Sequence, residues 1–201
     1  MQRSIKKVVV LGSGVMGSRI ACQFAGLGVE VLLLDMLSPG SEASTIAKER
    51  NKLVNDSLQA AIKSNPSPLY LAKFAQNIST GNFKDDIAKI ANADWIIEVV
   101  VERLDIKKII YDEVEKYRKP STLISSNTSG IPIHLMAEGR SEDFQKHFCG
   151  THFFNPPRYL RLLEIIPTAK TDPAVIDFHM HYGDVYSVSY THLTLPTKRI
   201  V

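Results

Sequence analysis

The chain has 201 residues, enough for one domain or slightly more, and its 44% of hydrophobic residues can build a sizeable core. Its net charge of +3 comes from interleaved acidic and basic residues, so charge gives no reason to expect a nucleic-acid or membrane partner. No apolar run approaches membrane-spanning length, and two cysteines without a signal peptide favour the reducing cytoplasm.

A glycine-rich turn stands near the start of the chain. It reads Gly12-Ser13-Gly14-Val15-Met16-Gly17 and directly follows the apolar run 7–11, which is typical of a buried parallel strand. A stretch with helical spacing of apolar residues comes next, and a second apolar run, 30–35, ends in Asp35. This order predicts a dinucleotide-binding unit, in which a strand, a glycine turn, a helix, a second strand and an acidic residue follow one another.

Each glycine of this turn has a physical reason. Gly12 permits the tight turn, Gly14 lets the backbone approach a pyrophosphate, and Gly17 permits close packing of helix on strand. The helix N-terminus offers free N–H groups to the phosphates. Asp35 would bind the ribose hydroxyls and repel a 2′-phosphate, which favours NAD over NADP. The predicted cofactor contacts here are Gly12, Gly14, Val15, Met16, Gly17 and Asp35. A chance match in a glycine-rich turn is the alternative.

The middle of the chain is more polar. Residues 41–63 have roughly helical spacing of apolar residues, the segment 65–68 contains two prolines that end this helix, and a shorter helix is predicted over 69–74. We interpret these as a helical excursion after the second strand. Asp85-Asp86 can then cap a short helix that ends near Ala91.

Apolar runs mark the later elements. They predict strands at 95–101, 122–126, 149–154 and 160–166. A helix from Asp105 to Tyr117 separates the first two, and Asp172-Pro173 starts a final helix. The pattern predicts an α/β fold of the Rossmann type, with a doubly wound, mostly parallel sheet.

Polar side chains follow two of these strands. Glu102 and Lys107 come after the run 95–101 and could reach a ribose or nicotinamide at the carboxyl end of the sheet. The alternative is a solvated strand end followed by an ordinary surface helix. Asn127 and Ser129 follow the run 122–126, where they could bind an amide or an alcohol, or serve as turn and cap residues.

A histidine and a glutamate lie on the last two predicted strands. His152 ends one apolar strand and Glu164 lies on the next, joined by a turn that contains Pro156-Pro157. If that turn folds the strands back on each other, the carboxylate can orient the imidazole and stabilise its charged form, giving a general base. The alternative is a core histidine satisfied by a neighbour. The other histidines have no partners at ligand spacing, so no metal site is expected.

These motifs, in this order, resemble the NAD-binding domain of L-3-hydroxyacyl-CoA dehydrogenases. The resemblance covers about residues 4–184 and rests on the glycine turn and on three further segments, 101–104, 126–129 and 152–156. Residues 151–167 are most similar to long bacterial forms fused to an enoyl-CoA hydratase. The resemblance implies oxidation of a (S)-3-hydroxyacyl-CoA to the 3-ketoacyl-CoA by NAD, a step of fatty-acid β-oxidation.

The resemblance also implies roles for the residues. His152 takes the hydroxyl proton, Glu164 orients it, and Ser129 hydrogen-bonds the substrate oxygen, with Asn155 as a further substrate contact. Glu102, Lys107 and Asn127 are placed near the nicotinamide half of the cofactor.

The end of the chain departs from the family. Residues 1–184 are expected to form the NAD-binding domain, whereas residues 185–201 match nothing in the family and look like translated vector sequence. In the family a C-terminal helical domain follows, completes the acyl-CoA cleft and forms most of the dimer interface. With that domain missing, we expect the chain to bind NAD but to turn over poorly, and the parent enzyme to be a homo-oligomer. The alternatives are a non-catalytic NAD-binding module and a dehydrogenase of a small hydroxy acid.

Overall fold

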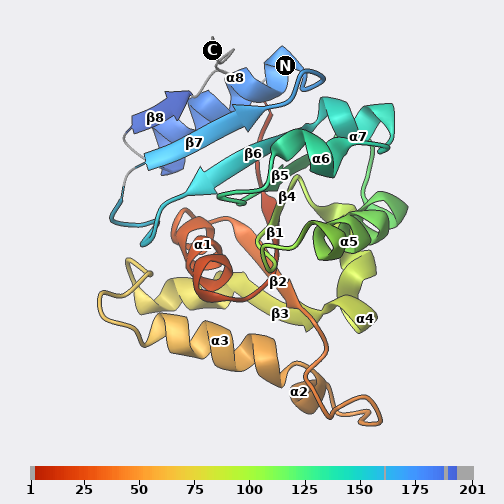
Figure 1. The fold of residues 1–201 in the computed structure, drawn as a ribbon. Coiled ribbons are helices and arrows are strands. Elements are labelled where there is room, and N and C mark those ends of the chain that lie inside the picture. Colours follow the sequence, from red (N-terminus) through yellow and green to blue (C-terminus); the bar gives the residue numbers. More distant parts are fainter. Residues whose placement is uncertain (1–2, 161, 188–189, 194–201) are drawn as a thin grey trace.

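A computed structural model describes residues 3–160, 162–187 and 190–193. Its centre is one eight-stranded sheet with the order β3-β2-β1-β4-β5-β6-β7-β8 (Figure 1). Neighbouring strands from β3 to β6 are parallel, β7 runs antiparallel to β6, and β8 is parallel to β7. The 3-2-1-4-5-6 part of this order is that of a Rossmann fold, so the predicted fold class is confirmed.

The strands are β1 (Lys7–Leu11), β2 (Glu30–Asp35), β3 (Ile78–Asn82), β4 (Trp95–Glu98), β5 (Leu123–Ser126), β6 (Phe148–Phe153), β7 (Leu162–Pro167) and β8 (Tyr190–Leu193). The α-helices are α1 (Val15–Gly26), α2 (Ala47–Arg50), α3 (Lys52–Ile62), α4 (Phe83–Asp86), α5 (Leu104–Tyr117), α6 (Ile133–Ala137), α7 (Glu142–Lys146) and α8 (Pro173–Tyr182). Two 3-10 segments, η1 (Ala72–Asn77) and η2 (Ile87–Asn92), and a π-helical turn, η3 (Gly183–Ser187), complete the described elements.

Side chains of alternate strand residues build a separate core on each face of the sheet. Val8 and Val10 of β1 pack with residues of α1, α3 and α8 on one face. Val9 and Leu11 pack with residues of η2, α5, α6 and α7 on the other. Because both faces are covered, β1, β2 and β4 are apolar except at their ends, which is why they were visible in the sequence as apolar runs.

The predicted excursion after β2 exists, but its elements differ from the prediction. Residues 41–46 are not helical, and Asn51 separates α2 from α3. The prediction of a helix over 69–74 was wrong, because the helical segment there is η1, which begins later at Ala72. The sequence analysis also missed β3, which pairs with β2 at the edge of the sheet. β3 is an edge strand, with a neighbouring strand on one side only. Its residues are largely polar, so the sequence shows no apolar run there.

Two further local predictions need correction, and two short helices were missed. Asn82, and not the pair Asp85-Asp86, caps α4, since its side chain accepts hydrogen bonds from the N–H groups of Lys84 and Asp85. The strand predicted over 95–101 ends at Glu98, because the chain turns there into a site loop. The short helices α6 and α7 were not predicted, since five residues are too few to show a periodicity.

The predicted tail is described only in part. Four of its residues, Tyr190–Leu193, form β8 beside β7. Residues 188–189 and 194–201 lie outside the described residues, so the prediction for the tail as a whole stays a prediction.

Candidate active site

The carboxyl ends of four parallel strands meet at one edge of the sheet. The register places Leu11 of β1 beside Glu98 of β4, Glu98 beside Ser126 of β5, and Ser126 beside Gly150 of β6. The loops that follow β1, β4 and β5, and the last residues of β6, therefore lie along this edge, where ligands bind in open α/β sheets. The predicted site residues are in these segments, in α1 and α5 that follow them, on β2 and β7 beside them, or, for Asn155, in the segment between β6 and β7.

The three glycines of the turn after β1 sit in three different environments. Gly12 has a φ of +104°, and a Cβ there would lie 2.6 Å from the carbonyl oxygen of Val99. A Cβ on Gly17 would lie 1.8 Å from the carbonyl oxygen of Gly12, so helix α1 can approach the turn only with glycine at this position. Gly14 has no neighbour within 4 Å, so the open space that a pyrophosphate needs is present.

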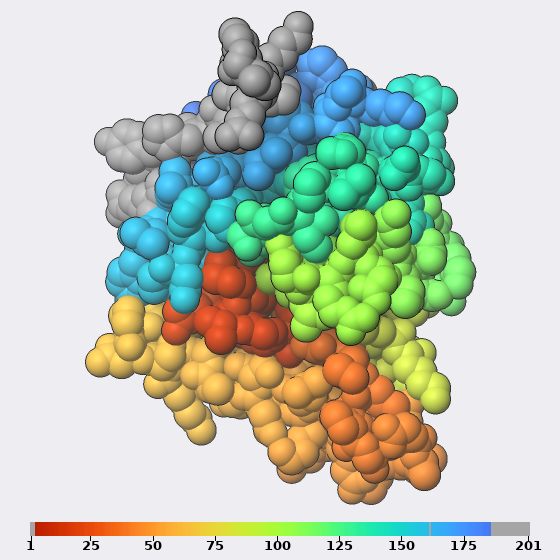
Figure 2. All heavy atoms as spheres, viewed as in Figure 1, coloured from red at the N-terminus to blue at the C-terminus, as the bar shows by residue number. Residues whose placement is uncertain are grey.

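The N-terminus of α1 is open to an anion. Its first turn carries no acidic residue and no side chain caps it, so the N–H groups there remain available. Gly14 and Val15 are exposed, and Figure 2 shows red atoms of the early chain reaching the surface between blue, green and yellow segments. Asp35, at the end of β2, accepts hydrogen bonds of 2.5 Å from both the N–H and the hydroxyl of Ser13. It therefore braces the glycine turn.

A carboxylate that the sequence analysis did not select lies at the centre of this edge. Glu98 is 0% exposed, and its Oε1 accepts hydrogen bonds from Lys107 Nζ and from the N–H of Val100, both at 2.7 Å. Its Oε2 accepts from the hydroxyls of Ser126, at 2.5 Å, and Tyr111, at 3.0 Å. An acid inside an apolar strand was the available signal, because a buried charge requires partners.

Glu102 and Lys107 lie beside each other after β4 but differ in exposure. Glu102 is 43% exposed, and its Oε1 accepts hydrogen bonds from Thr128 Oγ1 and from the N–H groups of Ser129 and Gly130. Burial alone would raise the pKa of Glu102, but these hydrogen bonds and the charge of Lys107 lower it to about 2, so it is an acceptor at neutral pH. Lys107 is only 1% exposed, which rules out the alternative of an ordinary surface helix face at that position.

Asn127 and Ser129 follow β5 and have different surroundings. The side-chain oxygen of Asn127 accepts a 2.8 Å hydrogen bond from the N–H of Phe153, so it ties the loop after β5 to the residue next to His152. Ser129 is exposed, with its N–H bound to Glu102. Its hydroxyl therefore stays available for a ligand.

His152 and Glu164 lie directly opposite each other on the antiparallel strands β6 and β7. The imidazole Nδ1 lies 2.8 Å from a carboxylate oxygen of Glu164, as the predicted fold-back of the two strands required. The side chains are 20% and 30% exposed, so neither belongs to a sealed core. With Nδ1 engaged as the donor, the lone pair lies on Nε2, at the far side of the ring.

The segment between β6 and β7 lies against α1. Asn155, an exposed residue of this segment, accepts a hydrogen bond from Arg19 of α1. Farther along, Arg158 donates hydrogen bonds of 2.9 and 2.7 Å to the carbonyl oxygens of Ser67 and Leu69, and its guanidinium carbon lies 4.0 Å from the centre of the Tyr70 ring. These contacts fix the segment that carries Asn155 beside the dinucleotide unit.

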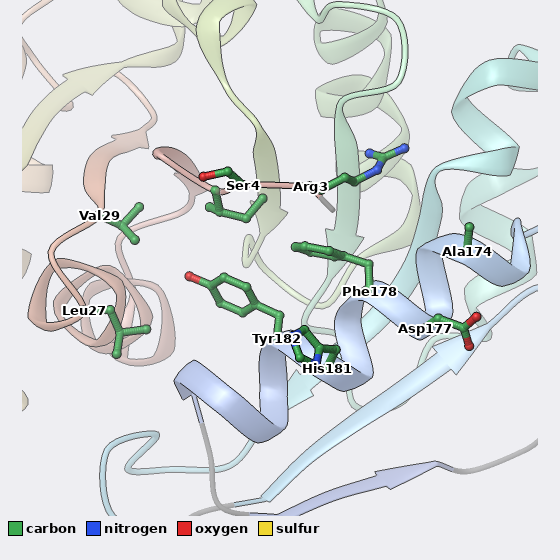
Figure 3. Close-up of a pocket in the computed structure, with 10 residues that line it drawn as sticks. Arg3, Ser4, Leu27, Val29, Ala174, Asp177, Phe178, His181 and Tyr182 are labelled. Carbon is green, nitrogen blue, oxygen red and sulfur yellow. The ribbon is translucent and has the colours of Figure 1, made fainter. Parts of the chain in front are cut away.

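A pocket of about 690 Å³ lies away from this site. It is lined by residues before β1 and β2 and by side chains of α8, among them Phe178, His181 and Tyr182 (Figure 3). This is the amino edge of the sheet, and none of the predicted site residues lines the pocket. Within the described residues, no group of three or more His, Cys, Asp or Glu side chains could hold a metal ion, and no helix is long and apolar enough to cross a membrane.

Comparison with known proteins places this site in a family. Residues 7–186 match the family described as "3-hydroxyacyl-CoA dehydrogenase, NAD binding domain". The chain belongs to this family. It is 48% identical over 192 residues to a probable 3-hydroxyacyl-CoA dehydrogenase of Bacillus subtilis, a match that covers 92% of this chain and 24% of the relative. It is 49% identical over 172 residues to a protein of the same description from Deinococcus radiodurans, covering 86% of this chain and 48% of the relative.

Solved structures agree with the family. The (S)-3-hydroxybutyryl-CoA dehydrogenase PaaH1 of Ralstonia eutropha is 26% identical, with a TM-score of 0.72 over 94% of this chain and 63% of its own. The chain thus spans a quarter to a half of the two curated relatives and less than two thirds of this structure. As the NAD-binding domain of a 3-hydroxyacyl-CoA dehydrogenase, the chain has NAD as its cofactor, and the open space at Gly14 and the uncapped α1 fit that ligand.

Proposed function

We propose that this chain is the cofactor-binding part of an enzyme that oxidises (S)-3-hydroxyacyl-CoA to 3-ketoacyl-CoA with NAD, in fatty-acid β-oxidation. The observation that carries the proposal is the His152–Glu164 pair, at 2.8 Å on adjacent strands of the site edge. A module that only binds NAD has no use for a partly exposed imidazole oriented by a carboxylate.

The chemistry follows from these positions. Bound NAD supplies the acceptor for the hydride that leaves C3 of the substrate. His152 Nε2 takes the proton of the 3-hydroxyl, while Glu164 holds Nδ1 and stabilises the imidazolium that forms. The Ser129 hydroxyl binds the substrate oxygen, and Asn155 contacts the substrate from the segment between β6 and β7.

The cofactor roles proposed for the remaining residues follow the same edge. The glycine turn with Val15 and Met16 holds the pyrophosphate, and Asp35 binds the adenosine ribose. Asn127 and Glu102 act at the nicotinamide half. The side chain of Lys107 is almost fully buried, so we propose that it acts there through Glu102, whose Oε2 lies 3.4 Å from its Nζ.

The wider context is also a proposal. An acyl-CoA pocket and a homo-oligomer interface would be completed by the additional length that the relatives have. The NAD-binding domain would occupy residues 1–184, with 185–201 of other origin, which sequencing the gene beyond the codon for Asp184 tests. Two free, buried cysteines, Cys22 and Cys149, support a reducing cytoplasmic location.

The test is a chimera in which this chain replaces its matching part of the Deinococcus relative. We expect the chimera to oxidise NADH in the presence of acetoacetyl-CoA, and the 201-residue chain alone to bind NADH with little turnover. His152→Gln in the chimera is expected to lower kcat by about 10²–10⁴-fold without weakening NADH binding, because the group that takes the hydroxyl proton in the oxidation, and returns it in this reverse assay, is lost.

The matched control is His134→Gln, which changes an exposed histidine on α6. It should leave turnover unchanged. A chimera that binds NADH and turns over equally well with and without His152 would refute the assignment of the base. Normal turnover by the 201-residue chain alone would refute the need for additional sequence.

A further inference from the structure

The buried carboxylate at the end of β4 connects the loop after β4, the end of β5 and helix α5. Its hydrogen bonds reach Val100 in the loop after β4, Ser126 at the end of β5, and Lys107 on α5. The carbonyl oxygen of the same residue, Glu98, accepts a 2.8 Å hydrogen bond from the N–H of Asn127. The next residue, Val99, bonds through its N–H to the carbonyl oxygen of Leu11, immediately before the glycine turn.

Lys107 extends this network to Glu102. An ammonium group has three N–H donors, and three acceptors surround the Nζ of Lys107: Glu98 Oε1 at 2.7 Å, Val100 O at 3.4 Å and Glu102 Oε2 at 3.4 Å. With 1% of its side chain exposed, Lys107 has no donor left for a ligand. Its charge is used to hold the two glutamates.

Glu102 completes the connection to the loop after β5. Its Oε1 accepts the N–H groups of Ser129 and Gly130, at 3.1 and 3.0 Å. The path from Glu98 through Lys107 and Glu102 therefore ends on the residue proposed to bind the substrate oxygen. Glu98 and Lys107 are buried, whereas Glu102 and Ser129, at the far end of the path, face solvent.

We propose that Glu98 is a positioning residue of the NAD site, which holds Glu102 and the loop 126–130 in their working places through Lys107 and Ser126. The inference rests on the assignment of this edge as the cofactor site. A buried ion pair can often be replaced by neutral side chains at little cost in stability. A pair kept only for stability would therefore be replaceable without effect on the site, whereas a positioning pair would not.

The experiment uses Glu98→Gln, Lys107→Met and the double variant of the 201-residue chain. Each single variant removes one partner of the buried pair and is expected to melt at a lower temperature. The double variant has no buried charge left at this pair and is expected to recover most of the wild-type melting temperature. Its NADH affinity, from nicotinamide fluorescence, is nevertheless expected to be about tenfold weaker or more.

Amide hydrogen exchange supplies a readout that does not need the cofactor. In the double variant the N–H groups of Ser129 and Gly130 should exchange faster than in the wild type, because Glu102 has lost Lys107, while exchange in β1 and β2 stays the same. The double variant Glu113→Gln/Lys116→Met is the control: it makes the same two changes at an exposed ion pair of the same helix, so these two amides and NADH binding should not change.

Two outcomes separate this inference from the proposed function. A double variant with wild-type stability, NADH affinity and loop exchange would overturn the positioning role of Glu98. A wild-type chain that binds no NADH would overturn cofactor binding by this chain alone, and the exchange of Ser129 and Gly130 would still decide whether Glu98 positions the loop.

Discussion

The dinucleotide unit and the cluster around His152 are assembled in different ways. The first consists of β1, the glycine turn, α1 and β2, which follow one another within residues 7–35. The second combines Glu102, the loop after β5, His152 and Glu164, which come from four separate segments. In the first, spacing along the chain fixes the geometry. In the second, the sheet register fixes it, since it places Glu98 beside Ser126 and His152 beside Glu164.

This difference predicts different responses to substitution. A change in the dinucleotide unit acts on backbone packing, because its key positions are glycines that contact backbone atoms. A change in the His152 cluster acts on side-chain chemistry, because the strands keep their register without it. Substitutions in the first region should therefore change stability and cofactor binding. Substitutions in the second region should change turnover.

The largest effect is expected from Gly17→Ala. The added Cβ would lie 1.8 Å from the carbonyl oxygen of Gly12, so α1 must move away from the turn. We expect a loss of about 3 kcal/mol in the free energy of unfolding, at the upper end for overpacking. Urea denaturation followed by circular dichroism measures it.

Gly14→Ala is the matched variant within the same turn. Nothing lies within 4 Å of its added Cβ, so the fold should stay intact, but the methyl group fills the space of the pyrophosphate. The Kd for NADH should rise at least about tenfold, which corresponds to about 1.4 kcal/mol. Equal effects of both variants on stability would contradict the separate roles of the two glycines.

The next effect is expected from Glu164→Gln in the chimera. Glutamine can still accept a hydrogen bond from His152 but has no charge to stabilise an imidazolium. We expect kcat to fall by about 10²-fold, with NADH affinity and melting temperature nearly unchanged. Glu142→Gln, at an exposed pair with Lys146, is the control. A parallel loss of NADH binding would mean that the two regions are not separable.

The contrast also explains what the sequence could predict. The glycine turn, Asp35 and the apolar strands were predictable because each depends on residues near one another in the chain. The approach of His152 to Glu164 was predictable because one short turn joins their strands. Glu98 was missed, and Lys107 was not expected to be buried, because their pairing depends on how α5 packs on the sheet. The polar edge strand β3 was missed because half of its backbone positions face no partner strand.

A further effect concerns pH and a buried histidine that belongs to neither region. His179 of α8 is fully buried, and its Nδ1 bonds at 2.7 Å to the carbonyl oxygen of Val175. Its Nε2 has no hydrogen-bond partner among the described residues, and the Trp95 ring lies 4.7 Å away, centre to centre. A proton on Nε2 would therefore be buried without an acceptor. Burial lowers the pKa of His179 from 6.5 to about 4.

The direction of the change in stability with pH follows from the state, folded or unfolded, in which His179 binds its proton. Between pH 6.5 and 4 the unfolded chain carries a proton on this histidine and the folded chain does not, so stability is complete above pH 6.5 and falls with acid. From pH 7 to pH 5 the loss should be about 2 kcal/mol in the free energy of unfolding. His179→Leu should flatten the dependence of stability on pH. His181 is exposed on the same helix, so His181→Leu should leave that dependence unchanged. An unchanged pH dependence in His179→Leu would place the acid-sensitive group elsewhere. Hydrogen exchange at pH 5 supplies a local readout: amides of β6 and α8 should exchange before those of β1 and β2, because the buried imidazole belongs to α8 and lies beside Cys149 of β6.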